Sequence, residues 1–334
     1  SGHGPLAIFL LEQGADPNVI SSLNGVSPLW ATVNSEWQPR TRFPQPQERG
    51  QQNDGYLEAM EALLEAGADV DHRITMHPWY MVYTGCGNGN CGLINTNGAT
   101  AFLRSAYATD SDAMRLLHSW GADAYISTKA PEPRRPRGAD QRDEALEQLA
   151  DADGYAEMTD SAKVSVLRSI WTQLPDSVKE DVPEFAVDDT PDAVREEVVA
   201  HAQRQDSVAA ATPDPSGLPP VEVDGPGVWA IHAASGVGYG EGFAGNAHRH
   251  VDRGWLPSVK FLIEEVGMDV NARDHNGYTA MHHAAARGDN DLIMYLVGKG
   301  GDVTVVSRKG QSTADMANAP VSRLSPLPET IALL

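Results

Sequence analysis

Short apolar runs recur along the chain, and each one leads into the same kind of polar turn. The runs LAIFLL, AMEALL, AMRLLH, VKFLIE and LIMYLV precede phrases that align without gaps: EQGADPNV (12–19), EAGADVDH (65–72), SWGADAYI (119–126), EVGMDVNA (265–272) and GKGGDVTV (298–305). Glycine ends a helix without strain in such a turn, because it adopts the left-handed conformation freely. The pattern predicts a series of helices, with Gly67 and Gly121 at two of the helix ends.

A second motif follows each turn and begins another helix. It appears as NGVSPLWATV (24–33), NGATAFLRSAY (97–107), HNGYTAMHHAAARGD (275–289) and RKGQSTADMAN (308–318). Asn-Gly favours a tight hairpin turn, and a hydroxyl side chain can cap the next helix by accepting a backbone N–H. The predicted caps are Ser27, Thr100, Thr279 and Thr313. No such unit can bury its apolar face alone, so we expect the units to stack.

These motifs resemble the ankyrin repeat family. YTAMHHAAARGD and DVNARDHNG are similar to the family patterns T-P-L-H-x-A-A-x-x-G and D-V-N-A-x-D-x-x-G. The resemblance implies an all-α solenoid of about five or six repeats. It also implies a structural role for His232 and His282, whose imidazoles would bond backbone across adjacent repeats. The chain departs from the family pattern at Ala101, Ala280, Ile231 and Asp315.

Long insertions interrupt the repeats. Three are loops, at 38–54, 77–95 and 237–257, the last of them rich in glycine. The fourth has Pro-rich ends and contains three helical patterns, at 140–152, 160–174 and 190–205. We therefore expect three parts, namely amino-terminal repeats (1–129), an inserted small helical subdomain (130–224) and carboxyl-terminal repeats (225–334).

Acidic side chains outnumber basic ones, 46 against 25, which gives a net charge of −21. Such a surface repels phosphate backbones and anionic lipid heads, and no run approaches the ~18 consecutive apolar residues of a membrane-spanning helix. We therefore expect no nucleic-acid partner and no insertion into a membrane. Residues 130–224 alone carry a net charge of −13, which indicates either a solvated acidic face or a surface that meets a basic partner.

Two cysteines, Cys86 and Cys91, lie in the loop GCGNGNCGLINTNG. The Gly- and Asn-rich residues between them can bend enough to close a small disulfide ring; the alternatives are two idle thiols or half of a metal site. A disulfide would place the protein in an oxidising compartment, the periplasm or the cell exterior. The cytoplasm is the alternative. The repeats together with the glycine-rich insert are also similar to uncharacterised secreted bacterial ankyrin-repeat proteins.

Two histidines of the loop NAHRH are the candidate metal ligands. His248 and His250 form a His-x-His pair near Glu241 and Asp252, and such a set would supply three ligands to zinc or another divalent ion. The alternative is that one imidazole packs against Trp255 while the other is solvated. Another histidine, His283, is predicted to be a helix or surface residue. We otherwise expect no cofactor.

Aromatic residues gather in or beside the insertions: Trp37, Trp79, Tyr80, Tyr239, Phe243 and Trp255. Trp and Tyr dominate binding hot spots, but the same residues can pin insertions to the solenoid. No nucleophile has an adjacent base in the sequence, so we expect no catalysis. The sequence predicts a protein-interaction module or assembly subunit that binds another protein through its hairpin fingers and insert loops. The alternative is a metal-dependent enzyme or metal-binding protein that uses His248 and His250.

Overall fold

The structure is a computed structural model that describes residues 3–37, 55–78, 94–131, 158–174, 214–242, 249–321 and 324–334, and three helical positions at 179, 196 and 200. The chain forms two compact units. The larger unit contains Ser1–Glu132 and Asp214–Leu334, and the smaller contains Pro133–Pro213. Residues 214–224, which the sequence placed with the insertion, belong to the unit that holds the repeats.

Helices of the larger unit come in pairs. The first helices of the pairs are α2 (Pro28–Glu36), α5 (Ala101–Tyr107), α11 (Ala230–Ser235), α13 (Ala280–Arg287) and α15 (Thr313–Ala317). Their partners are α3 (Tyr56–Glu65), α6 (Ser111–Ser119), α12 (Trp255–Glu264), α14 (Asn290–Gly298) and α16 (Pro328–Leu333). Another helix, α1 (Gly4–Glu12), precedes them and packs against α3.

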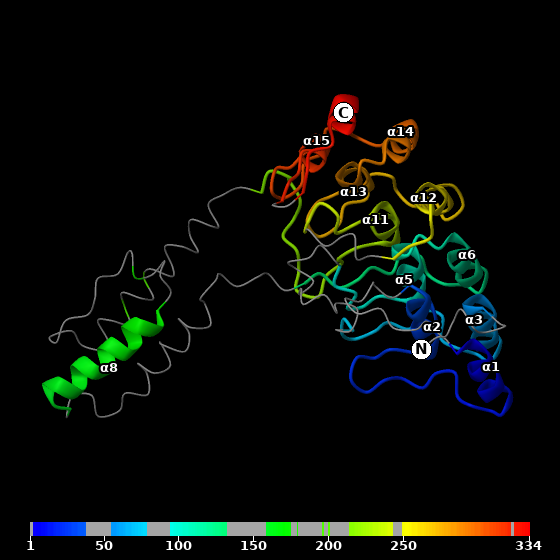
Figure 1. Ribbon diagram of the computed structural model, residues 1–334, viewed down its shortest axis with the longest axis horizontal. Coiled ribbons are helices and arrows are strands. Elements are labelled where there is room, and N and C mark those ends of the chain that lie inside the picture. The colour runs from blue at the N-terminus through cyan, green and yellow to red at the C-terminus, as the bar shows by residue number, and fades with distance from the viewer. Residues whose placement is uncertain are drawn as a thin grey trace. The chain divides into compact units, whose positions relative to one another are not determined.

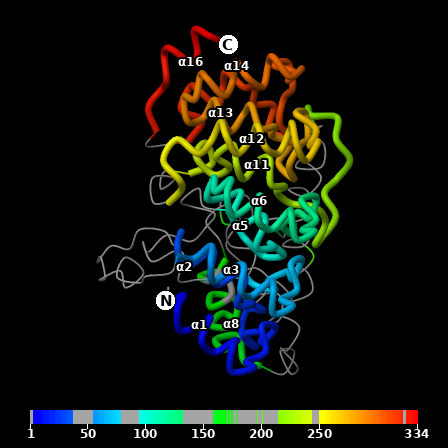
Figure 2. The backbone as a smooth tube through the Cα atoms, turned by 90° about the vertical axis from the view of Figure 1, so that its right-hand side faces the viewer, coloured from blue at the N-terminus to red at the C-terminus, as the bar shows by residue number. Residues whose placement is uncertain are grey.

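The pairs stack in chain order, as Figures 1 and 2 show. The first helices form one row, in which α2, α5, α11, α13 and α15 each contact the next. The second helices form another row, in which α12 contacts both α6 and α14. Among the described residues, β pairing is limited to one bridge, between Lys129 and Pro226. The prediction of an all-α solenoid is confirmed.

The large insertion leaves and re-enters the stack at one place. The backbone N–H of Thr128 donates to Val228 O at 2.9 Å, and that of Ala130 donates to Gly225 O at 2.8 Å. These bonds hold the two ends of the insertion side by side, so that α5 contacts α11 although more than a hundred residues separate them in the chain. The repeat before the insertion therefore packs on the repeat after it as any neighbour would.

Small side chains let the first helices pack closely. Ala233, Ala234, Ala284 and Ala285 are completely buried, and they belong to a single apolar core that runs through all of the pairs. Burial of apolar surface stabilises by about 25 cal/mol per Å², and the helices that bury these alanines belong to different repeats. Stability of each repeat consequently depends on its neighbours.

Turn chemistry agrees with the sequence at the helix ends. Gly67 and Gly121 have φ values of +91° and +89°, the left-handed conformation that the motif requires. The hydroxyls of Ser27 and Thr100 cap their helices, since each accepts a hydrogen bond from the backbone N–H of the residue three positions later, Trp30 and Leu103. The prediction for Thr313 is wrong. Ser312 is the cap, because its Oγ accepts from Asp315 N while Asp315 Oδ2 accepts from Ser312 N, and Thr313 is the first helical residue.

The smaller unit contains α8 (Asp160–Gln173), within the second of the three helical patterns predicted for the insertion. Leu167 and Leu174 are buried, as expected for the apolar face of this helix. The patterns at 140–152 and 190–205 lie outside the described residues, apart from two helical positions at 196 and 200.

None of the helices that the structure describes combines the length and the apolar character required to cross a membrane.

Candidate functional site

Hairpin turns project between successive repeats, and those nearest the amino terminus carry exposed apolar side chains. We call residues 19–26 and 72–76 the amino-terminal fingers. The backbone N–H groups of Thr75 and Met76 both bond Asn24 O, at 3.0 and 3.3 Å, so the two fingers lie side by side. Leu23 is 69% exposed and Met76 is 52% exposed. Val19 and Ile20 of the first finger are also exposed.

The corresponding turns of the carboxyl-terminal repeats are occupied by the chain itself. We call residues 214–222, which return from the insertion, the strap. Arg308 donates from Nε to His275 O at 2.9 Å and from Nη2 to Pro219 O at 2.6 Å, and it pairs with Asp214. Arg273 donates from Nη1 to Ser216 O at 3.2 Å. Two arginines of neighbouring turns therefore hold the strap in place.

His232 and His282 have the structural role that the repeat motif implied. His232 Nε2 lies 2.8 Å from Ala272 O of the next repeat, and His282 Nε2 lies 3.2 Å from Gln311 O. The second nitrogen of His282, Nδ1, accepts from the backbone N–H of Thr279 at 3.2 Å. Burial, which outweighs the neighbouring carboxylate of Asp274, lowers the pKa of each histidine to about 4. Both imidazoles are therefore neutral near pH 7 and have no free nitrogen for a ligand.

The described residues among the predicted aromatic anchors pack into the fold. Trp37 Nε1 and Tyr56 Oη donate to the same oxygen, Oδ2 of Asp110, at 2.8 and 2.6 Å. Burial and the negative charge of Asp110 raise the pKa of Tyr56 well above its ordinary value, so its hydroxyl stays a donor. These bonds fix the two ends of the 38–54 insertion against the cap of α6.

Trp255 is only 8% exposed, a position that agrees with the alternative that it pins an insertion to the solenoid. The guanidinium carbon of Arg287 lies 3.7 Å from the centroid of the indole, a cation–π contact. Tyr239 meets the same ring edge-on at 5.8 Å. These residues hold the ends of the glycine-rich insertion rather than offering a free surface. Other predicted anchors, at Trp79, Tyr80 and Phe243, lie outside the described residues.

His250 packs against Trp255, with 4.5 Å between the ring centroids. Its Nδ1 lies 2.9 Å from Val251 O, so one nitrogen of this candidate ligand is engaged by backbone. His248, the other candidate metal ligand, lies outside the described residues, as do Cys86 and Cys91. The metal and disulfide predictions at these positions stay predictions.

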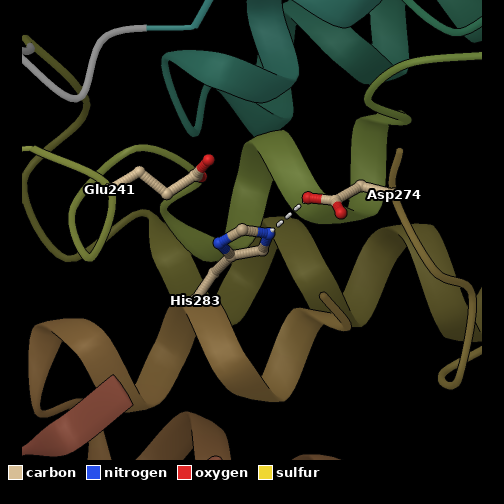
Figure 3. Close-up of side chains that lie close together, drawn as sticks. All are labelled: Glu241, Asp274 and His283. Carbon is tan, nitrogen blue, oxygen red and sulfur yellow. Dashed lines mark hydrogen bonds and ion pairs between the residues drawn. The ribbon is translucent and has the colours of Figure 1, made fainter. Parts of the chain in front are cut away.

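A different polar cluster, shown in Figure 3, involves Glu241 but neither histidine of the loop. His283 lies in a helix, α13, as one of its two predicted positions required, and it is completely buried rather than at the surface. Its Nε2 lies 3.1 Å from Oδ2 of Asp274, which begins the hairpin turn before α13. Glu241, in the glycine-rich insertion, completes the group, and one ligand atom from each of the three residues lies within 4.8 Å of the others.

The pKa values of the two carboxyl groups, Asp274 and Glu241, shift in opposite directions. Burial alone would raise the pKa of Asp274, but the hydrogen bond and charge of His283 outweigh it and hold that pKa near 2. Burial and the charge of Asp274 raise the pKa of Glu241. The arrangement keeps Asp274 ionised and favours a positive partner, either a proton or a cation, at Glu241. The sequence offered one signal for this cluster, the adjacent histidines His282 and His283. Only one of two adjacent side chains can bond the next repeat, so the other had to find a different partner.

Known proteins share the repeat. The family model for ankyrin repeats (many copies) matches residues 247–297. An ankyrin repeat-containing protein of Schizosaccharomyces pombe is 41% identical over 46 residues, which cover 14% of this chain and 22% of that protein. The repeats of this chain are ankyrin repeats. Helix pairs, hairpin turns and the histidine ladder all agree with that assignment.

Other ankyrin relatives match over similarly short stretches. Mouse protein phosphatase 1 regulatory subunit 27 is 33% identical over 69 residues, or 21% of this chain and 44% of that protein. Human ankyrin repeat domain-containing protein 49 is 38% identical over 52 residues, or 16% of this chain and 22% of that protein. The crystal structure of the human ASB11 ankyrin repeat domain, at 14% identity, covers 100% of this chain and 97% of its own with a TM-score of 0.34, too low to add to the fold assignment.

The matched stretches therefore span less than half of each of these relatives. The relatives named come from yeast, mouse and human, and they lend no support to a bacterial origin or to secretion. Both remain expectations from the sequence.

Proposed function

We propose that this chain is a non-catalytic protein-binding module whose amino-terminal fingers contact a partner protein. Ankyrin repeats generally mediate protein–protein interaction, and one relative is named as a regulatory subunit of a phosphatase. The observation that carries the proposal is the exposure of Val19, Ile20, Leu23 and Met76 on two adjacent fingers. Large apolar side chains gathered on a solvent-facing surface mark interaction sites more often than chance.

Energetics favour these residues as anchors. Complete burial of one side chain of this kind contributes about 1.5–3 kcal/mol, so the four exposed side chains together would offset much of the free-energy cost of association. Backbone hydrogen bonds between the fingers fix Leu23 and Met76 relative to each other before binding, which reduces the entropy lost on association. The insertions 38–54 and 77–95, which lie near the fingers in the sequence, belong to the same proposed binding region.

Charge narrows the kind of partner. A net charge of −21 attracts a protein with a basic surface and repels an acidic one. Such attraction acts mainly on the association rate and weakens as salt is added. We therefore infer a partner that combines an apolar contact area with a basic rim.

A hydroxyl of the described residues lies beside an imidazole, but both groups are part of the repeat structure. The hydroxyl of Thr279 lies 2.9 Å from Nδ1 of His282, the geometry of a nucleophile beside a base. Both residues are buried, however, and Nε2 of His282 bonds Gln311 O. A substrate has no access to this hydroxyl, which supports a binding role.

The test is capture of a partner from the native source by the immobilised full chain, read by mass spectrometry. Leu23→Ser combined with Met76→Ser removes both anchors. Val223→Ser combined with Val303→Ser is the matched control, because those valines are also exposed but lie elsewhere in the chain. We expect one dominant protein at a fixed ratio, retained at least about tenfold less by the finger variant and equally by the control.

Other outcomes contradict the proposal. Equal retention by both variants would remove the fingers from the interface, and the absence of any stoichiometric protein would remove the binding role. A dimer seen by native mass, and dissociated by the finger variant, would assign the surface to a second copy of the chain.

The proposed compartment is oxidising, on the argument of Cys86 and Cys91. Thiol counting under denaturing conditions on protein from the native source decides it. No reactive thiol supports the periplasm or the cell exterior, whereas two reactive thiols support the cytoplasm.

A further inference from the structure

The glycine-rich insertion meets the turn before α13 and α13 itself at one buried point. Glu241 comes from the glycine-rich insertion after α11, Asp274 from the turn before α13, and His283 from α13 itself. Figure 3 shows the imidazole between the two carboxylates, with one nitrogen toward each side. The ligand atoms all lie within 4.8 Å of one another.

This cluster has an unmet bonding requirement. Nδ1 of His283 has no hydrogen-bond partner among the described residues, although the side chain is completely buried. An unpaired buried polar atom costs about 1–3 kcal/mol. Two carboxylates whose ligand atoms lie within 4.8 Å of each other add a second requirement, because neighbouring buried like charges repel each other unless a cation lies between them.

We propose that Glu241, Asp274 and His283 bind a divalent transition-metal ion of the zinc class. One imidazole nitrogen with carboxylate oxygens is a donor set that suits zinc. Zinc bonds to such donors are about 2.0–2.2 Å long, so two donors of one tetrahedral ion lie roughly 3.3 Å apart. The separation of 3.1 Å between Asp274 Oδ2 and His283 Nε2 fits that geometry with the ion at Nε2, so the unpaired Nδ1 on the other side of the ring is not a ligand. Glu241, on a half-buried turn, has the freedom to close the remaining gap.

Each carboxylate is already oriented by neighbouring groups. Asp274 Oδ1 accepts from the backbone N–H groups of Asn276 and Tyr278, both at 2.9 Å, which leaves Oδ2 for the ion. Glu241 Oε2 accepts from the side-chain amide of Asn276 at 3.0 Å, and its Oε1 accepts from Gly238 N at 3.2 Å. Asn276 therefore supports both carboxylates. Such outer-shell contacts are typical of metal sites and hold the ligands in place.

Metal binding at this point would join the insertion to the solenoid. Glu241 accepts a hydrogen bond from Asn276, so it links the 236–241 turn to the hairpin before α13. A dication would neutralise the two carboxylates and tie α11, the insertion and α13 into one body. The site therefore acts as a structural clip, and the NAHRH loop is not required for it.

The experiment uses the untagged full chain, stripped with chelator and desalted. Zinc alone is then titrated by calorimetry, and bound zinc is measured by elemental analysis after gel filtration. We expect one zinc per chain and a higher Tm with zinc than with chelator. Cobalt(II) in place of zinc is expected to give the intense visible absorption of a tetrahedral site with nitrogen and oxygen ligands.

Variants identify the ligands. Glu241→Gln and Asp274→Asn keep the size of these side chains and one of their two oxygen acceptors. His283→Leu replaces the buried imidazole by an apolar side chain that favours a helix. Loss of an outer-shell partner already lowers metal affinity about 10–100-fold, so loss of a ligand is expected to raise the Kd for zinc at least roughly 100-fold. His250→Gln is the matched control and should leave the Kd unchanged.

Several results overturn the proposal. These are no retained zinc and no effect of zinc or chelator on Tm, or zinc binding that survives all three ligand variants, or binding that is lost in His250→Gln. If His283→Leu fails to fold, Glu241→Gln and Asp274→Asn decide the matter, because both keep the residues' shape.

Discussion

Amino-terminal and carboxyl-terminal repeats of this ankyrin chain couple to their neighbours in different ways. Three residues after the cap, the first helices carry Trp30 in α2 and Leu103 in α5, but His232 in α11 and His282 in α13. All four side chains are completely buried. The apolar pair contributes only packing, whereas each histidine also bonds a carbonyl of the following repeat.

The same division appears at the hairpin turns. Arg273 and Arg308 hold the strap across the carboxyl-terminal turns, while the amino-terminal fingers expose Leu23 and Met76. Arginines bond neighbouring turns in both halves, since Arg73 bonds Gly98 O and Ser127 O, but only in the carboxyl-terminal half of the described residues do they also hold the strap over the edge. The comparison indicates that the strap reinforces the carboxyl-terminal half, whereas the edge of the amino-terminal half stays accessible to the partner that we propose.

Removal of Trp30 should give the largest effect, because the amino-terminal half depends on packing. Trp30→Ala leaves a cavity between α2 and α5 and is expected to destabilise by about 3–5 kcal/mol. Urea unfolding measures the loss, and hydrogen exchange shows whether α2 and α5 open before α13. Trp120→Ala is the control, because Trp120 is 43% exposed at the end of α6, and a change within about 0.5 kcal/mol is expected. Equal losses would contradict the division.

Acid should weaken one point of the amino-terminal half. His77 accepts a hydrogen bond from Thr96 N at 3.2 Å, and burial, assisted by the charge of Arg104, lowers its pKa from 6.5 to about 4. The unfolded chain therefore binds the proton more readily between these pH values. The stabilisation is complete above about pH 6.5, falls as the pH drops, and is lost near pH 4, a change of about 3 kcal/mol.

His77→Phe should reduce this pH dependence without abolishing it, as measured by urea unfolding between pH 7 and pH 4, because His232 and His282, whose pKa values are also lowered to about 4, remain. His118→Gln removes an exposed imidazole and should leave the dependence as it is in the parent chain. An unchanged slope in His77→Phe would show that other groups cause the acid sensitivity.

Local rules predicted most of the fold. Gly67, Gly121, Ser27 and Thr100 act through their own turn of backbone, so the sequence motif alone predicts their conformation. Thr313 was misassigned because Ser312 and Thr313 are adjacent hydroxyl residues, and the capping box with Asp315 selects the first. Such a choice depends on a side-chain hydrogen bond that residue type does not reveal.

The candidate sites could not be predicted in the same way. Glu241 meets Asp274 and His283 only because the insertion folds back on α13, a long-range contact that leaves no period in the sequence. The strap was read as part of a Pro-rich linker, since its bonds to Arg273 and Arg308 are mostly to backbone carbonyls. Bonds to backbone carbonyls cannot be predicted from residue types, because every residue has a carbonyl.

Release of the strap should cost less than the loss of Trp30. Arg308→Ala removes the bonds to His275 O and Pro219 O and is expected to destabilise by about 1–2 kcal/mol. Protease should then cut within residues 214–222, and mass spectrometry locates the cut. Arg73→Ala is matched, because Arg73 bonds Gly98 O and Ser127 O at an amino-terminal turn but no strap. Cleavage of the strap in Arg73→Ala would mean that the arginine of the carboxyl-terminal turn is not its specific support.

The smallest effect is expected where the two halves meet. Arg115 of α6 forms a bidentate ion pair with Glu265 after α12, and both side chains are about half exposed. Because solvent screens such pairs, Glu265→Gln should lower Tm by no more than about 2–3 °C at low salt and by less at high salt. Arg115 also covers the ring of Phe261, with 4.6 Å to the centroid, so Arg115→Ala should cost more than Glu265→Gln. The double variant separates the two contributions. If the ion pair alone joins the halves, both single variants lose the same stability; if packing joins them, only Arg115→Ala has a clear effect and salt does not change it.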